Sequence, residues 1–237
     1  MKRCTLLICF FLAYGTTYNQ ANDYVKILGT DLQVGNLKDY GLSSFERKEP
    51  TFSGSPLLWG EWTPGSLKLK GKKEFIQKEY HIIYDCFRKL LYLKLDESEY
   101  NVNLEMVDSI LLGTTNGLSR NFVTLRNNKG INDLYEILLD SETLSLLLKT
   151  EAYIGSQSYS PAFDIGSKKP KLSLKESLYL SRNGELYELT KRRKAFIDKY
   201  EKTEELEDIV SYFKEKKVNF KKSEDVRSAL LELEYED

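Results

Sequence analysis

The sequence predicts an α+β protein: an antiparallel β-sheet or partial barrel of about eight strands at residues 57–189, followed by a C-terminal helical segment. Three observations support this. Apolar and polar residues alternate before residue 190, Asn183-Gly184 is a favoured two-residue turn, and apolar residues recur at helical spacing after residue 200. We divide the chain into a signal peptide, an irregular lead-in, a β-rich domain and a helical segment, at residues 1–21, 22–56, 57–189 and 190–237.

The alternation is clearest in two neighbouring segments of the expected sheet. Alternate residues there are apolar: Tyr80, Ile82 and Tyr84 in the first segment, and Leu91, Leu93 and Leu95 in the second. This spacing is typical of antiparallel strands with one buried face. Apolar runs at residues 121–125, 131–140 and 143–154 extend the sheet, whereas the Gly-, Ser-, Pro- and Lys-rich residues 155–176 predict a loop.

The last two strands are expected to form a hairpin around Asn183-Gly184. A two-residue type I′ turn needs positive φ at both central positions, which this dipeptide tolerates. The cross-strand pairs that follow from this turn are Arg182 with Glu185, Leu180 with Tyr187, and Leu178 with Leu189.

Four cations, Lys191, Arg192, Arg193 and Lys194, follow the hairpin. With Thr190 as a cap they would form the first turn of a helix, where positive charge opposes the helix dipole. This mismatch is the main argument for a functional basic patch that binds an anionic glycan, a lipid headgroup or an acidic protein. The alternative is a solvent-exposed helix face, which we favour because residues 191–237 contain 12 Lys and Arg against 13 Asp and Glu.

A short internal repeat at residues 203–213 and 223–233 predicts two packed helices. Each copy begins with a cap, Thr203 or Ser223, and continues with two acidic residues that suit a helix N-terminus. Each copy then carries an apolar stripe, formed by Leu206, Ile209, Val210 and Phe213 in the first and by Val226, Ala229, Leu230 and Leu233 in the second. The stripes indicate an antiparallel helical hairpin.

The first residues have the layout of a secretory signal peptide. Lys2 and Arg3 precede an apolar run from Thr5 to Tyr14, and small residues suited to cleavage follow. The run is shorter than the roughly 20 apolar residues that span a bilayer. A buried N-terminal helix or strand is the alternative. We expect an exported protein, periplasmic or at the cell surface, that is not integral to the membrane.

Composition limits the classes of partner and chemistry. Charged residues make up 30% of the chain and the net charge is −1, so no overall field attracts nucleic acid, and we expect none to bind. His81 is the only histidine, and no zinc-type spacing of Cys and His occurs, so we expect no metal and no cofactor. Loss of the signal peptide would leave Cys86 as the last cysteine, without a disulfide partner in its own chain.

Few residues suggest a site. Trp59, Trp62 and Tyr80 could form a platform for a sugar or a peptide, although aromatic residues just before a strand more often pack in the core. Asp85 is a candidate for acid–base catalysis, but a chain with 36 acidic residues always brings some carboxylates together. Cys86 could act as a nucleophile, with a buried thiol as the alternative.

Two stretches carry a resemblance. Residues 53–85 contain a Gly-x-Pro segment and an aromatic-x-x-Gly before a strand, a turn and a strand that ends in Tyr-Asp. Residues 177–235 contain a Tyr-rich hairpin, a Lys-rich helix and the run KEKKVNFKKSEDVRSALLELE. On these motifs the chain resembles secreted Bacteroidetes proteins of unknown function. The resemblance implies a β-rich region followed by a Lys-rich helical C-terminus, and it carries over no catalytic residue.

Three functions remain open. The leading hypothesis is an exported, non-enzymatic envelope protein that binds another envelope protein or a surface polymer. The second is a small-ligand module for a sugar or a peptide, which a concave aromatic pocket around Trp59, Trp62 and Tyr80 would favour. The third is a carboxylate-based hydrolase around Asp85, which two buried carboxylates with raised pKa values in one cleft would favour.

Overall fold

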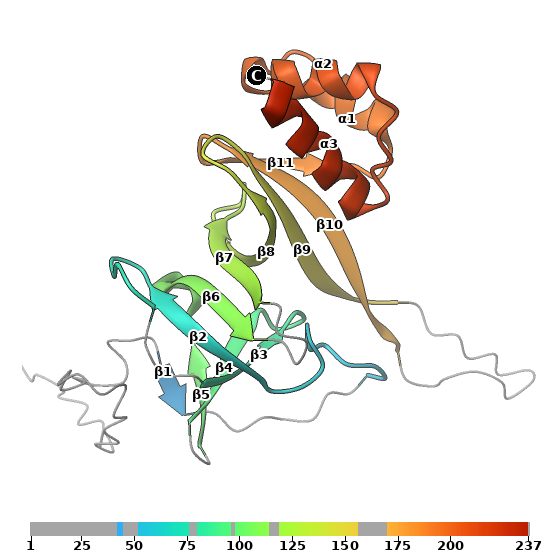
Figure 1. Cartoon of the computed structure of the whole chain (residues 1–237). Coiled ribbons are helices and arrows are strands. Elements are labelled where there is room, and N and C mark those ends of the chain that lie inside the picture. The colour runs from blue at the N-terminus through green and yellow to red at the C-terminus, as the bar shows by residue number, and fades with distance from the viewer. Residues whose placement is uncertain are drawn as a thin grey trace, which may run out of the picture.

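The computed structural model describes residues 42–44, 52–75, 80–95, 98–113, 119–155 and 170–236. Within these ranges the chain forms one antiparallel sheet of eleven strands, followed by three α-helices (Figure 1). The fold is therefore α+β, as the sequence predicts. The expected signal peptide at residues 1–21 and most of the lead-in at 22–56 lie outside the described residues.

The strands follow the chain in a simple order. They are β1 (Leu42–Ser44), β2 (Thr63–Leu69), β3 (Tyr80–Asp85), β4 (Leu90–Leu95), β5 (Ser98–Val102), β6 (Val107–Gly113), β7 (Ser119–Arg126), β8 (Asn132–Asp140), β9 (Ser145–Ile154), β10 (Leu172–Arg182) and β11 (Glu185–Leu189). Their order across the sheet is β1-β5-β4-β3-β2-β6-β7-β8-β9-β10-β11. From β7 to β11 each strand lies beside its predecessor in sequence, whereas β6 pairs with β2.

Three strands account for the difference between the eight expected and the eleven observed. β1 has three residues and lies in the expected lead-in. β5 has five residues, so its alternation rests on only two apolar side chains, Tyr100 and Val102. β6 pairs with β2 through a register shift between Lys68 and Leu69, and such a bulge breaks the period-two pattern that reveals a strand.

The expected loop at 155–176 is wrong at its C-terminal end, because β10 begins at Leu172. The residues Leu172 to Glu176 pair with Ile154 to Thr150 of β9. Backbone pairing with a long neighbour therefore outweighs the polar composition that suggested a loop.

The hairpin prediction is confirmed. Asn183 and Gly184 have φ values of 53° and 81°, as a type I′ turn requires. The observed register joins the expected pairs, which are Arg182 with Glu185, Leu180 with Tyr187, and Leu178 with Leu189.

Residues 52–58 connect two strands that are not neighbours in the sheet. Ser53 forms a parallel bridge with Lys171 beside β10, and Leu57 forms an antiparallel bridge with Asp85 at the end of β3. The sheet itself stays open, since β1 and β11 are its two edges. Residues 52–58 thus link β3 and β10 outside the continuous ladder of the sheet.

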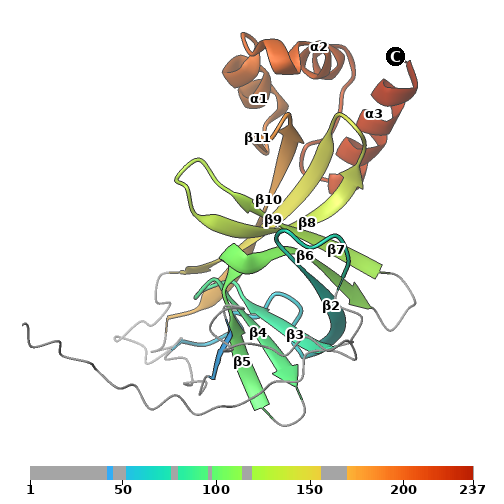
Figure 2. The same cartoon turned by 90° about the vertical axis from the view of Figure 1, so that its left-hand side faces the viewer.

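Two hydrophobic cores lie along the sheet. The first is built from β2 to β8 and includes Ile82, Leu91, Val107 and Ile110. The second joins β9, β10 and β11 to the helices and includes Leu146, Leu180, Phe196, Phe213 and Leu230. Figure 2 shows the consequence, with the helices at one end of the molecule and β3 to β5 at the other.

The C-terminal segment contains α1 (Arg193–Tyr200), a 3₁₀ turn (Glu204–Leu206), α2 (Glu207–Glu215) and α3 (Ser223–Glu236). The apolar stripes are confirmed, because Leu206, Ile209, Phe213, Val226 and Leu230 are each at most 1% exposed. Two of the expected caps, Thr190 and Thr203, differ. α1 begins at Arg193 rather than after Thr190, and Thr203 forms no side-chain capping bond. Packing of the stripes, rather than capping, therefore holds these short helices in place.

No helix among the described residues has the length and apolar character needed to cross a membrane.

Candidate functional site

One edge of β10 is only partly occupied. β10 pairs with β9 from residue 172 to 181, whereas β11 covers the opposite edge only from 178 to 182. Ser53 occupies that same edge at its other end, where its C=O accepts a hydrogen bond from Leu172 N–H (2.9 Å). Residues 173–177 lie between these two neighbours, and we call this stretch the edge gap.

The backbone groups of Leu174 and Glu176 point into the edge gap. Successive residues of an antiparallel strand direct their N–H and C=O groups alternately to the two sides. Leu172 donates to Ser53, away from β9, and Leu178 pairs with β11 on that same side. Leu174 and Glu176 share this parity. Within the described residues their N–H and C=O groups therefore have no partner.

Side-chain exposure shows the same opening. Leu174, Lys175 and Glu176 are consecutive and all exposed, Leu174 at 38%. Consecutive side chains of a strand point to opposite faces, so a strand with one covered face exposes only alternate residues. Three exposed residues in a row mean that side chains on both faces of β10 are exposed here.

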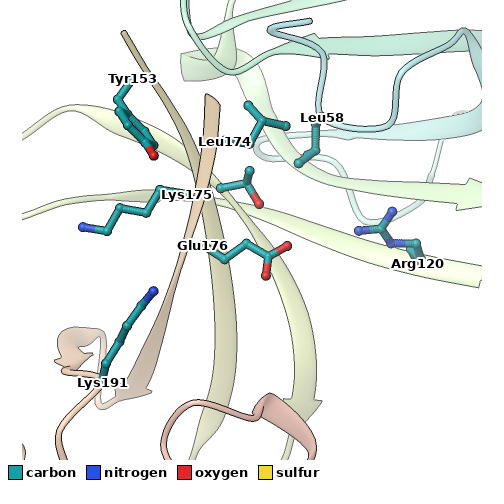
Figure 3. A pocket seen from close by; sticks show the side chains of 8 residues that line it. Leu58, Arg120, Tyr153, Leu174, Lys175, Glu176 and Lys191 are labelled. Atoms are coloured by element: carbon teal, nitrogen blue, oxygen red, sulfur yellow. The ribbon is translucent and has the colours of Figure 1, made fainter. Parts of the chain in front are cut away.

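Two hollows border the edge gap and share three lining residues, Lys175, Glu176 and Lys191. We call the two hollows together the groove. The first has a volume of about 360 Å³ and is shown in Figure 3. There Leu174 and Leu58 point toward each other on one side of β10, and Lys175 extends to the other side.

The second hollow has a volume of about 500 Å³ and extends from β10 to the helical segment. Its apolar wall includes Leu148, Leu178, Leu189 and Phe220. The second hollow joins the sheet to the start of α3. The groove as a whole therefore runs from the first core toward the second. The groove thus offers a binding partner both apolar surface and backbone hydrogen-bonding groups.

Positive charge dominates the groove. Its charged lining residues are Arg120, Lys175, Lys191 and Lys221 on one hand, and Glu176 and Glu188 on the other. Arg120 binds Glu136 through two hydrogen bonds of 2.7 and 2.5 Å, and this bonding raises the pKa of Arg120. Within the described part of the chain, the side chains of the three lysines form no ion pair.

The structure separates the four cations of the predicted basic patch. Lys191 lines the groove, whereas Arg192 and Lys194 are exposed outside it. Arg193 donates hydrogen bonds to the C=O groups of Phe213 and Lys216 (3.1 and 2.6 Å). A cation at these carbonyls suits the C-terminus of α2, so Arg193 has a structural contact that the sequence did not reveal. A ligand-binding role for the patch stays a prediction.

Two of the three predicted aromatic residues, Trp59 and Tyr80, lie at the first core. Tyr80 is 2% exposed, and Trp59 packs against the core while donating its indole N–H to Ile82 C=O (3.0 Å). The ring of Trp59 also meets Phe122, with centroids 5.3 Å apart. Trp62 is half-buried. These contacts give Trp59 and Tyr80 a packing role, and ligand binding by the trio stays a prediction.

Asp85 is fully buried and engaged in the turn between β3 and β4. Its carboxylate accepts hydrogen bonds from the N–H groups of Phe87 and Arg88 and from the Arg88 guanidinium, at 2.8 to 2.9 Å. Cys86, beside it, is also buried, and burial together with the charge of Asp85 raises the pKa of the thiol to about 12. His81 lies on the exposed side of β3. These contacts favour structural roles for Asp85 and Cys86.

A second buried carboxylate, Asp133, was not singled out by sequence. It accepts hydrogen bonds from Lys149 and Lys89 (both 2.6 Å) and from Asn127 (2.7 Å). Burial alone would raise the pKa of Asp133, but the hydrogen bonds from the two lysines lower it. Asp133 is therefore an anion at neutral pH, unlike the protonated acid that a hydrolase of the predicted kind needs.

No signal in the sequence marked the groove, because its lining residues come from segments far apart in the chain. These segments include β7, β9, β10, the residues just before α1 and the start of α3.

The described residues contain no cluster of three or more His, Cys, Asp or Glu side chains that could share a metal ion. Comparisons with protein-family models, with curated proteins and with solved structures found no match for this chain.

Proposed function

We propose that the protein is an exported, non-enzymatic binding module of the cell envelope, and that it holds another protein or a surface polymer in the groove beside β10. One observation carries this proposal: Leu174, Lys175 and Glu176 are all exposed in the middle of a strand that is paired on its other edge. Proteins usually cover or shorten such edges, because open strands attract other chains.

The chemistry of the buried carboxylates supports a binding role over hydrolysis. Asp85 is satisfied by three hydrogen bonds within one turn, and Asp133 is held as an anion by two lysines. Neither group is free to deliver or accept a proton at a substrate. Export rests on the N-terminal pattern of Lys2 and Arg3 before a short apolar run.

Site-specific photo-crosslinking in envelope preparations tests the proposal. A benzophenone amino acid at position 176 should form a defined crosslinked species, and the same group at the exposed turn residue Lys129 should not. Lys175→Glu combined with Lys191→Glu should remove the crosslink because the groove loses its positive charge. Equal crosslinking from positions 176 and 129 would contradict the proposal, and an intact Met1 on the envelope protein would contradict export.

A small-ligand role has one specific observation in its favour, away from the predicted aromatic trio. A hollow of about 540 Å³ beside β5 is lined by Lys89, Asn101, Asn103, Glu105 and Asn132, among others. The side-chain oxygens of Asn101 and Asn132 are buried and have no hydrogen-bond partner among the residues that the structure describes. A sugar hydroxyl would satisfy such acceptors. Calorimetric titration with neutral oligosaccharides, repeated on Asn101→Ala, tests this role, and heats that the substitution leaves unchanged would exclude the hollow.

A further inference from the structure

We propose that the groove binds its partner by β-strand addition: an extended, acidic segment of another protein pairs with the edge gap of β10. This inference rests on the proposed function and specifies the kind of partner. Strand addition draws affinity from backbone hydrogen bonds, and specificity from side chains that alternate between the two faces.

The edge gap has the size and the free groups that strand addition needs. Its five residues span roughly 17 Å at the usual rise of a strand. Leu174 and Glu176 each present one N–H and one C=O to the edge gap, where no described residue pairs with them. Ser53 at one end and Leu189 at the other already use the same edge for pairing, so an added strand would complete an interrupted ladder.

Alternation assigns a different environment to each face of the added strand. A residue opposite Leu174 places its side chain beside Leu174 and Leu58, which is an apolar environment. The next residue places its side chain on the other face, beside Lys175 and Lys191. The matching segment therefore alternates apolar and acidic residues.

Charge selects an acidic partner over a neutral or basic one. Four cations and two carboxylates line the groove, and among the described residues only Arg120 of these cations has an ion-pair partner, Glu136. Lysine on an open strand edge also deters self-pairing, so the same residues that admit an acidic strand disfavour a second copy of this chain.

Synthetic peptides test the inference on the full chain. The probe is a fluorescein-labelled heptapeptide, Val-Glu-Val-Glu-Val-Glu-Val, with its Lys-for-Glu analogue as the charge control. Two N-methylated versions separate backbone from side-chain effects. Methylation of the valine nitrogens removes the donors that face β10, and methylation of the glutamate nitrogens alters those that face solvent. We expect valine methylation or the lysine analogue to weaken binding at least tenfold, and glutamate methylation to weaken it less than threefold.

Two protein variants complete the test. Glu176→Pro removes the N–H that faces the gap and leaves every β9 ladder bond, so it should abolish peptide binding while thermal unfolding stays cooperative. Glu176→Gln keeps the N–H and should keep binding. If Glu176→Pro fails to fold, the methylated peptides decide alone.

The outcomes separate this inference from the proposed function. A crosslink from position 176 without binding of the acidic peptide would overturn strand addition and leave the groove as a binding site. Equal binding of the methylated peptides would overturn backbone pairing. Sedimentation that shows a dimer, lost in Glu176→Pro, would overturn the separate partner and assign the edge to a second copy.

Discussion

The ammonium group of Lys149 lies 2.6 Å from Oδ2 of Asp133, and the two side chains are 8% and 1% exposed. The pair joins adjacent strands β9 and β8, and its neighbours are also charged. Lys89 reaches the second carboxylate oxygen from the β3–β4 turn at 2.6 Å, and Glu151 lies 2.9 Å from Lys149. The network thus connects the turn of the first core to the middle of the sheet.

Removal of the Asp133 carboxylate charge should lower the free energy of unfolding substantially. Asp133→Asn leaves Lys149 buried without its main counterion, and breaking a buried pair in this way destabilises by about 3–5 kcal/mol. Urea denaturation at pH 7 measures the change. Asp108→Asn is the matched control, because Asp108 pairs with Lys68 at 3.0 Å with side chains 41% and 29% exposed. Its cost should stay below about 1 kcal/mol. Equal losses would show that the buried network contributes no more than a surface pair.

Stability should also fall in acid because of Asp133. Hydrogen bonds from Lys149 and Lys89 overcome burial and hold the pKa of Asp133 below its value in the unfolded chain, which is about 3.9. A group with a lowered folded pKa stabilises above the unfolded pKa, and the contribution is lost as pH falls through the folded pKa. Urea midpoints of the wild type should therefore drop below pH 4, and Asp133→Asn should drop less steeply. If the urea midpoints of the two proteins fall in parallel as the pH is lowered, Asp133 does not contribute to the acid sensitivity.

The thiol of Cys86 should react slowly in the folded protein. Burial and the charge of Asp85 raise its pKa to about 12, so little thiolate forms at pH 8. We expect a Cys4→Ser, Cys9→Ser variant to react with Ellman's reagent far more slowly in buffer than in urea. Fast reaction in buffer would reveal an accessible thiol and reopen a nucleophilic role for Cys86.

Local patterns explain which parts of the fold were predictable. The hairpin at Asn183-Gly184 was predicted residue by residue, because the turn and the alternation act over neighbouring positions. Tyr92 shows the limit of the same reasoning. Tyr92 lies between Leu91 and Leu93 in β4, so alternation places its side chain on the other face, which is the solvent face of a half-buried strand. Tyr92 is nevertheless only 1% exposed. Alternation assigns a side chain to a face, and the tertiary fold decides whether that face is covered.

The site was less predictable than the fold, because it depends on differences in strand length and on register. The edge gap exists because β11 has five residues and β10 has eleven. The sequence of β10 suggested a loop over that same stretch. Asp133 and Lys149 are common residue types 16 positions apart, and only the pairing of β8 with β9 brings them together.

Gly54 should be essential for the connection between residues 52–58 and β10. Its φ is +97°, and a Cβ at this position would lie 2.6 Å from Leu172 O. Gly54→Ala should therefore destabilise through both strain and overlap, by roughly 2–5 kcal/mol together. Gly60→Ala separates the two effects, because Gly60 has a φ of +76° and nothing within 4 Å. Its cost should be strain alone, about 1–2 kcal/mol. Equal urea midpoints for the two variants would show that the connection adapts without cost.

Substitutions in the apolar stripes of the helical segment should lower the free energy of unfolding. Leu206 and Leu230 are both fully buried in the second core, so replacing either with Ala should cost about 2–5 kcal/mol. Asp at either position should cost more, because it buries an unpaired charge. Glu207→Ala is the control, since Glu207 is exposed and should change stability by less than about 0.5 kcal/mol.

Arg227 distinguishes a docked helix from a solvated one. The stripe pattern places it outside the core, but its Nε donates a hydrogen bond to Leu138 C=O in β8 (3.0 Å). Arg227→Ala should therefore cost about 0.5–1.5 kcal/mol, between the losses of Glu207→Ala and the leucine variants. Thermal and urea unfolding of the four alanine variants gives the ranking. If all four unfold at the wild-type midpoint, α3 does not depend on the sheet for its stability, and the shared core of β9 to β11 with the helices does not form in solution.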